Sequence, residues 1–262
     1  MKYQFDEAKH AHLLDGSPLY GTSTVIKEVM PPFLAKWGAQ CAVDYLREGL
    51  IAHAKAEAES HKDTAISVEL FVEDVEKALQ EAVSAWSKVR NKAATKGTDL
   101  HAELEKYVTE CIEQGGTPIV SDSAQMYQVD MFSTWAIKNV DKFIASEVNT
   151  FSKNLWVGGI VDCIAKLKDG KYAVIDFKSA REAYFNHFAQ AAGYALQLEE
   201  SGYGNADGSN WKKLEDKILA LIIVPFGAKT LKPEMIENVE GYKSVFEKLV
   251  GVYEFMNSFN KK

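Results

Sequence analysis

The sequence has little cysteine, no long apolar segment and no excess of positive charge, and each of these gaps excludes a class of protein. Its 262 residues include only three cysteines, and none of them form the Cys-x-x-Cys spacing of a structural zinc or iron–sulfur site. No apolar run approaches the roughly 20 residues that cross a bilayer. The opening segment, MKYQFDEAKH, lacks the apolar core of a secretory signal, so we expect a cytoplasmic protein.

The shortage of positive charge bears on the choice of partner. Acidic residues (37) outnumber basic ones (30), and the net charge of −7 argues against broad nonspecific binding to polyanions. A local basic groove is still allowed, because attraction depends on where the charges lie. The composition is otherwise that of a globular protein with a substantial core.

The most informative stretch, Trp156–Lys178, is typical of a β-hairpin. Apolar and β-branched residues dominate residues 156–167 and 172–177. Between these runs lies the pair Asp169-Gly170, which tolerates the positive φ angles of a tight primed turn. The pattern therefore predicts two antiparallel strands that fold back about residues 168–171.

Charged residues interrupt both predicted strands. The hairpin brings Asp162 level with Asp176 or Phe177, and the strand period of two puts Asp176 and Lys178 on one face. Two carboxylates in an apolar sheet are unfavourable unless a cation compensates them, and Mg²⁺ and Mn²⁺ prefer oxygen ligands. The simpler alternative is an Asp176–Lys178 salt bridge with Asp162 hydrogen-bonded near the turn. The hairpin, both acids and the apolar flanks together favour a metal site.

The rest of the chain predicts an α/β (α+β) protein without a linker between independent domains. From residue 98 the predicted order is helix, extra helix, three strands, helix, strand, helix. The helices are predicted at 22–30, at 68–92, from 98 to about 114, and at 124–140, 185–200 and 234–260, and the strands outside the hairpin at 143–151 and 217–226. Residues 1–20 carry no clear pattern.

Three further residues and one basic cluster are candidates for function. His101 and Glu105 are four apart and share a helix face, and Glu147 interrupts the strand at 143–151. The two glutamates are the acids available for a second metal ion. The end of the 68–92 helix turns basic, either as charges favoured by the helix dipole or as phosphate contacts. This cluster comprises Lys88, Arg90, Lys92 and Lys96.

Five segments of the sequence carry the motifs of one known family. They are KGTDLHAELE (Lys96–Glu105), GGIVD (Gly158–Asp162), DFK (Asp176–Lys178), QAAGY (Gln190–Tyr194) and, less specifically, STVIKEVMPPFLAKW (Ser23–Trp37). Together they resemble the PD-(D/E)XK nuclease superfamily, whose core is αβββαβ, and within it the RecB-like exonucleases of phage and mitochondrial genome-maintenance type. Relatives with an iron–sulfur cluster carry four cysteines, which this chain lacks.

The resemblance implies a role for each residue of these motifs. The ligands of Mg²⁺ or Mn²⁺ would be His101, Asp162, Asp176 and the Phe177 carbonyl. The catalytic lysine would be Lys178, while Gln190 and Tyr194 would brace the site or touch the DNA. The lysine could deprotonate water if burial lowers its pKa.

The resemblance also implies a function and a domain plan. We expect residues 1–262 to form a single nuclease domain, with a PD-(D/E)XK core over 97–262. The mostly helical region 1–96 would form a wall or arch over the site, and Arg181 would join the basic cluster along the DNA. The expected activity is a DNA exonuclease acting on single strands or duplex ends in recombination, repair or replication. The alternatives are a structure-specific endonuclease and a catalytically silent DNA-binding module.

Overall fold

The computed structural model describes residues 2–30, 44, 46–49, 77, 81, 100–121, 127–228 and 230–259, which form a mixed α/β protein. The chain divides into two compact units, residues 1–31 with 97–262 and residues 32–96. In the second unit residues 44, 46–49, 77 and 81 are helical, and the remainder of the helix predicted at 68–92 lies outside the described residues.

The first unit is built on a six-stranded mixed sheet whose strands pair in the order β4-β6-β7-β8-β9, with β5 on the other edge of β6. β7 pairs parallel with β8 and β4 pairs parallel with β6, whereas the other pairs are antiparallel. The strands are β4 (Tyr20–Gly21), β5 (Val140–Ser152), β6 (Val157–Leu167), β7 (Tyr172–Lys178), β8 (Ile218–Pro225) and β9 (Glu234–Ile236).

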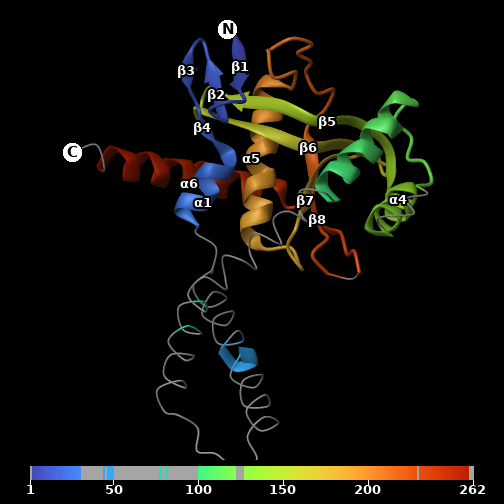
Figure 1. Ribbon diagram of the computed structural model, residues 1–262. Coiled ribbons are helices and arrows are strands. Elements are labelled where there is room, and N and C mark those ends of the chain that lie inside the picture. Colours follow the sequence, from blue (N-terminus) through green and yellow to red (C-terminus); the bar gives the residue numbers. More distant parts are fainter. Residues whose placement is uncertain are drawn as a thin grey trace, which may run out of the picture. The chain divides into compact units, whose positions relative to one another are not determined.

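Helices cover both faces of this sheet (Figure 1). The helical residues 100–113 and α4 (Tyr127–Asn139) bury one face, and α5 (Phe185–Ser201) buries the other. α5 connects the parallel strands β7 and β8 and packs in turn against α6 (Val239–Phe259). Both faces of β7 are therefore buried, which explains why its sequence is apolar without alternation.

The predicted hairpin is confirmed as β6 and β7, with a different turn. Within the loop at residues 168–171 only Gly170 has a positive φ, of 89°, so the loop is not a two-residue primed turn. The backbone N–H of Leu167 donates to the carbonyl of Lys171, which leaves residues 168–170 as a three-residue loop. Such loops place a glycine at the left-handed position, as Gly170 does here.

The first twenty residues, which carry no clear pattern, form a small antiparallel sheet in the same unit as residues 97–262. It consists of β1 (Tyr3–Asp6), β2 (Ala11–Leu14) and β3 (Ser17–Pro18). The hydroxyl of buried Tyr3 lies 2.5 Å from His12 Nδ1 and donates to Asn149 Oδ1 at 3.0 Å. This polar network ties the start of the chain to β5.

The helix predicted at 22–30 is confirmed as α1 (Thr22–Val29), and no side chain caps its first turn. Its N-cap is Gly21, which has no side chain to cap with. The Thr22 hydroxyl instead donates to the carbonyl of Gly158 on β6 at 3.0 Å. The hydroxyl thus joins α1 to the central sheet.

The other predicted elements lie within a few residues of their expected bounds, except at the start of the last helix. Residues 234–236 form β9 rather than the first turn of that helix, which begins at Val239. The open edge of β8 offers free hydrogen-bonding groups, and Ile236 takes a place opposite Leu221. Pairing at a sheet edge overrides the helical pattern there.

Candidate active site

The candidate site lies where β6 and β7 stop pairing. The last paired residues are Cys163 and Ile175, so Asp162 is the first residue of β6 beyond the ladder. Its carboxylate Oδ2 accepts the backbone N–H of Phe177 at 2.7 Å, and its carbonyl accepts the Ser146 hydroxyl at 3.2 Å. The Asp162 side chain thus replaces the next backbone hydrogen bond between β6 and β7, and its carboxylate is held between the two strands.

His101 reaches this carboxylate from the helix that covers residues 100–113. Its Nε2 lies 3.2 Å from Asp162 Oδ2, and its ring packs edge-on against Phe177 with centroids 5.8 Å apart. Leu104 and Val108, fully buried on the same helix, hold it against the sheet. The interaction with Asp162 raises the pKa of His101 against the opposing effect of burial.

Asp176 and Lys178 form a close ion pair on β7. Asp176 is 1% exposed, and its Oδ2 lies 2.6 Å from Lys178 Nζ. Its Oδ1 is buried and accepts no hydrogen bond from any described residue. Burial raises the pKa of Asp176 to about 6, and the charge of Asp162 adds to this rise while Lys178 opposes it. The structure thus contains the Asp176–Lys178 salt bridge that was the alternative to a metal site. It leaves Asp176 Oδ1 without a hydrogen-bond partner among the described residues.

The pKa of Lys178 moves opposite to the shift that proton abstraction requires. Burial alone would lower it, but the charges of Asp176 and Asp162 outweigh burial and raise it. With these two carboxylates uncompensated, Lys178 stays protonated. The expected fall in its pKa therefore requires a cation that offsets the carboxylates.

Gln190 and Tyr194 brace the site from α5. The Gln190 side-chain amide donates to the Tyr194 hydroxyl at 2.7 Å, and Tyr194 is 5% exposed. Only glycine fits opposite its ring, because a Cβ at Gly159 of β6 would lie 2.5 Å from Tyr194 Cε1. Burial, with the charges of Asp176 and Asp162, raises the pKa of Tyr194, so its hydroxyl stays neutral. The burial of Tyr194 fits bracing better than contact with DNA.

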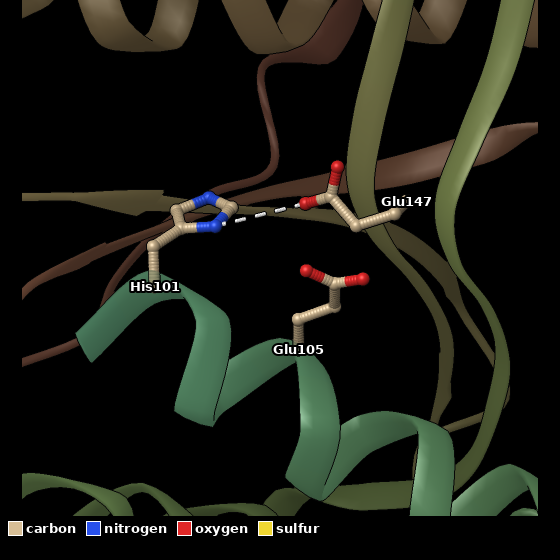
Figure 2. A group of neighbouring side chains, drawn as sticks. All are labelled: His101, Glu105 and Glu147. Atoms are coloured by element: carbon tan, nitrogen blue, oxygen red, sulfur yellow. Dashed lines mark ion pairs between the residues drawn. The ribbon is translucent and has the colours of Figure 1, made fainter. Parts of the chain in front are cut away.

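Two glutamates, Glu105 and Glu147, also lie close to the His101 ring (Figure 2). One ligand atom each from His101, Glu105 and Glu147 lie within 4.8 Å of one another. Glu147 Oε1 lies 3.7 Å from His101 Nδ1. Burial and then the charge of Asp162 raise the pKa of Glu147 to about 8. The two ring nitrogens of His101 thus face different carboxylates, Nε2 that of Asp162 and Nδ1 that of Glu147.

The predicted DNA-binding residues are mostly beyond what the structure describes. Arg181 is exposed in the segment that follows β7, three residues after Lys178. The basic cluster of Lys88, Arg90, Lys92 and Lys96 lies outside the described residues, and its contact with DNA stays a prediction.

His187 is a further candidate residue that the sequence pattern did not single out. It lies in the first turn of α5, and its Nδ1 accepts the backbone N–H of Tyr184 at 3.2 Å. Burial and the charge of Lys178 lower its pKa to about 4, so it is neutral with its proton on Nε2. Its spacing of three before Gln190 and seven before Tyr194 was the available signal, because these positions share a helix face.

The site thus combines side chains from the helical residues 100–113, the three strands β5, β6 and β7, and the crossover helix α5. No family model and no curated protein matches the chain. Among the described residues, no helix has the length and apolar character of a membrane span.

Proposed function

We propose that this chain is a divalent-metal-dependent deoxyribonuclease of the PD-(D/E)XK type, acting as an exonuclease on single strands or duplex ends. The observation that carries the proposal is the buried carboxylate of Asp176, whose Oδ1 has no hydrogen-bond partner among the described residues, close to Asp162 and His101. A buried carboxylate without a partner is costly unless a cation binds it. A structural ion pair with Lys178 alone would leave this oxygen unexplained.

The donor set fits Mg²⁺ or Mn²⁺. The residues that would hold the ion are Asp162, Asp176, His101 through Nε2, and the carbonyl of Phe177. Carboxylate and carbonyl oxygens suit Mg²⁺, and one imidazole nitrogen also suits Mn²⁺. A divalent ion bound there supplies a water of lowered pKa and stabilises negative charge on the phosphate.

The chain's own residues supply proton transfer and positioning. Once the carboxylate charges are compensated, burial prevails and lowers the pKa of Lys178, which can then take a proton from the attacking water. The water oxygen forms a bond to phosphorus, and the P–O bond to the leaving oxygen breaks. Neutral His187, with its proton on Nε2, supplies a donor for a phosphate oxygen beside Lys178. Gln190 and Tyr194, which are hydrogen-bonded to each other on α5, would brace Lys178 and the proposed ligands.

Cleavage assays on linear and circular DNA with Mg²⁺ or Mn²⁺ test the proposal. We expect degradation of linear DNA, no cleavage of closed circles and no activity with a chelator. Asp176→Ala should abolish cleavage, because it removes one of the two carboxylates that hold the ion in this proposal. Glu254→Gln, an equal loss of one negative charge at an exposed position of α6, is the matched control and should cleave normally.

Each contrary result points to a specific alternative. Cleavage of circles would replace the exonuclease with an endonuclease of the same fold. DNA binding without cleavage under any of these conditions would leave a catalytically silent binding module. Full activity in Asp176→Ala would refute the metal site.

A further inference from the structure

Glu147 has an unfavourable backbone conformation in the middle of β5. Its φ of 48° lies in the left-handed region, which side chains with a Cβ avoid. The register with β6 continues unshifted around it, from Ser146 opposite Cys163 to Val148 opposite Val161. No inserted residue and no turn accounts for this conformation.

The carboxylate of Glu147 is also unfavourably placed. Its Oε1 is buried and accepts no hydrogen bond from the described residues. It points toward the ring of His101, with 3.7 Å between Oε1 and Nδ1 (Figure 2). Strained backbone often persists where function requires it, so the placement of this side chain calls for a functional explanation.

The chemistry of imidazole supplies that explanation. A neutral histidine carries a proton on one ring nitrogen and a lone pair on the other. To bind an ion beside Asp162, His101 must present the lone pair of Nε2 and carry its proton on Nδ1. Without the ion, Asp162 favours the opposite arrangement, because it would accept a proton from Nε2 at 3.2 Å. A second acceptor facing Nδ1 is needed to favour the binding-competent tautomer.

We propose that Glu147 is the positioning residue of His101 and accepts its Nδ1–H, so that the Nε2 lone pair faces the ion site. This inference rests on the proposed function, because it assumes a cation between His101 and Asp162. Carboxylates that orient metal-binding histidines in this way are common in metalloproteins. The present separation of 3.7 Å between Oε1 and Nδ1 must shorten by about 0.7 Å to reach ordinary hydrogen-bond length, so the proposal requires the carboxylate to move closer when the ion binds.

The rival explanation is that Glu147 and Glu105 bind a second ion together with His101 Nδ1. The two explanations place the histidine proton on opposite nitrogens, because an Nδ1 that binds an ion cannot carry a proton. They also differ in the role of Glu105, which would be an equal ligand in the rival case. The tautomer of His101 therefore decides between them.

The test combines NMR of the ¹⁵N-labelled His101 ring with Mg²⁺ titration of the full-length protein. With Mg²⁺ bound, we expect the proton on Nδ1. Glu147→Ala should lower Mg²⁺ affinity by about 10- to 100-fold, the usual effect of losing such a carboxylate, and weaken the preference for Nδ1–H. Glu147→Gln should recover most of the affinity, because its amide oxygen can still accept. Glu105→Ala should lower affinity less than Glu147→Ala does.

Glu147→Gly separates this role from a merely structural one. Glycine favours a positive φ, so the variant should unfold at a higher temperature while its Mg²⁺ affinity falls as in Glu147→Ala. Unchanged affinity in both variants would overturn the positioning role while leaving the metal site intact. Equal losses for Glu105→Ala and Glu147→Ala, with Nδ1 unprotonated, would establish the rival instead. No Mg²⁺ binding by the wild type would overturn the proposed function itself.

Discussion

Lys178 shows how strongly the chemistry of a single residue depends on its neighbours. Burial favours its neutral form, and the nearby carboxylates of Asp176 and Asp162 favour its charged form more strongly. To accept a proton, Lys178 must be neutral, so the effect of burial on its pKa must outweigh that of the two carboxylates. In our proposal, a divalent charge shared by the two carboxylates produces this change, which couples proton transfer to occupation of the metal site.

Replacing Lys178 tests proton transfer directly. Lys178→Ala should lower the cleavage rate by roughly 10² or more, the usual contribution of a positioned acid–base group, with DNA affinity changed only modestly. Lys178→Arg should fail to restore the rate, because a guanidinium does not release its proton near neutral pH. Single-turnover cleavage and binding without a supporting metal provide the two measurements. An arginine variant that cleaves at the wild-type rate would reduce Lys178 to an electrostatic role.

The raised pKa values of Asp176 and Glu147 predict how stability changes with pH. Their folded pKa values, about 6 and about 8, lie above those of free carboxyl groups. The folded state therefore binds protons more tightly than the unfolded state, and stability falls as pH rises. The loss begins near pH 4 and is complete above about pH 8. Thermal unfolding with a chelator should show a falling midpoint over this range, and Glu147→Gln should flatten its upper part.

Added Mg²⁺ supplies the complementary measurement. Because protons and Mg²⁺ compete for the carboxylate of Asp176, whose pKa is raised to about 6, the rise in unfolding temperature caused by Mg²⁺ should be larger at pH 8 than at pH 5. A Mg²⁺ effect that does not depend on pH would place the binding site away from Asp176.

Some of these residues could be predicted from the sequence and others could not. A strand period and a hairpin register, both local properties, bring Asp162 close to Asp176 and put Lys178 on the same face as Asp176. The positive φ of Glu147 has no local signal, because neither glycine nor a turn residue marks this position in the strand pattern. The proximity of His187 to Lys178 likewise depends on how α5 docks after the crossover.

At the level of whole elements, α5 depends on glycine for its contact with α6. A Cβ at Gly193 would lie 2.6 Å from the ring of Phe246, which is fully buried on α6. Gly193 therefore lets the two helices approach closely. The same α5 carries Gln190 and Tyr194, so displacement of this helix would also disturb the candidate site.

Gly193→Ala should destabilise the protein by about 1–3 kcal/mol, the usual result of overpacking a core. The matched control is Gly251→Ala on α6, where an added Cβ meets nothing within 4 Å. Alanine favours helix over glycine, so this control should stabilise by roughly 0.5–1 kcal/mol. Chemical denaturation of both variants measures the difference. Equal effects of the two substitutions would show that the α5–α6 contact is not tightly packed.

Elements with strong internal patterns were predictable, and elements defined by their partners were not. The β6–β7 hairpin and α5 carry their periodicity and turn signals in their own residues. By contrast, β9 forms because the edge of β8 is open to pairing. The β1–β3 sheet is stabilised partly by the long-range bond from Tyr3 to Asn149, which no short window contains.

At the scale of the whole molecule, a protein with a net charge of −7 must concentrate its positive charge to bind DNA. In the sequence, positive charge is concentrated before the His101 helix, in the basic cluster of Lys88, Arg90, Lys92 and Lys96. These four residues lie outside the described part of the structure. Replacing Lys88, Arg90 and Lys92 together by Ala should weaken DNA binding and reduce its salt dependence, by about one unit of slope for each lost phosphate contact.

A triple variant of equal charge provides the control for this experiment. Lys212, Lys213 and Lys217 are all exposed between α5 and β8, and their joint replacement by Ala removes the same charge from elsewhere. Affinity measured over a range of salt concentrations should separate the two variants. Identical slopes would show that only net charge matters and that the DNA follows another path.

The pairing of β4 with β6 has a consequence for the order in which the protein is made. Tyr20 lies beside Val157 in the finished sheet, yet the ribosome releases the whole of residues 32–96 before β6 exists. During synthesis β4 therefore stays unpaired with the main sheet until residues 32–96 and then β6 have been made. The first unit can complete its sheet only after the whole of the second unit has been synthesised.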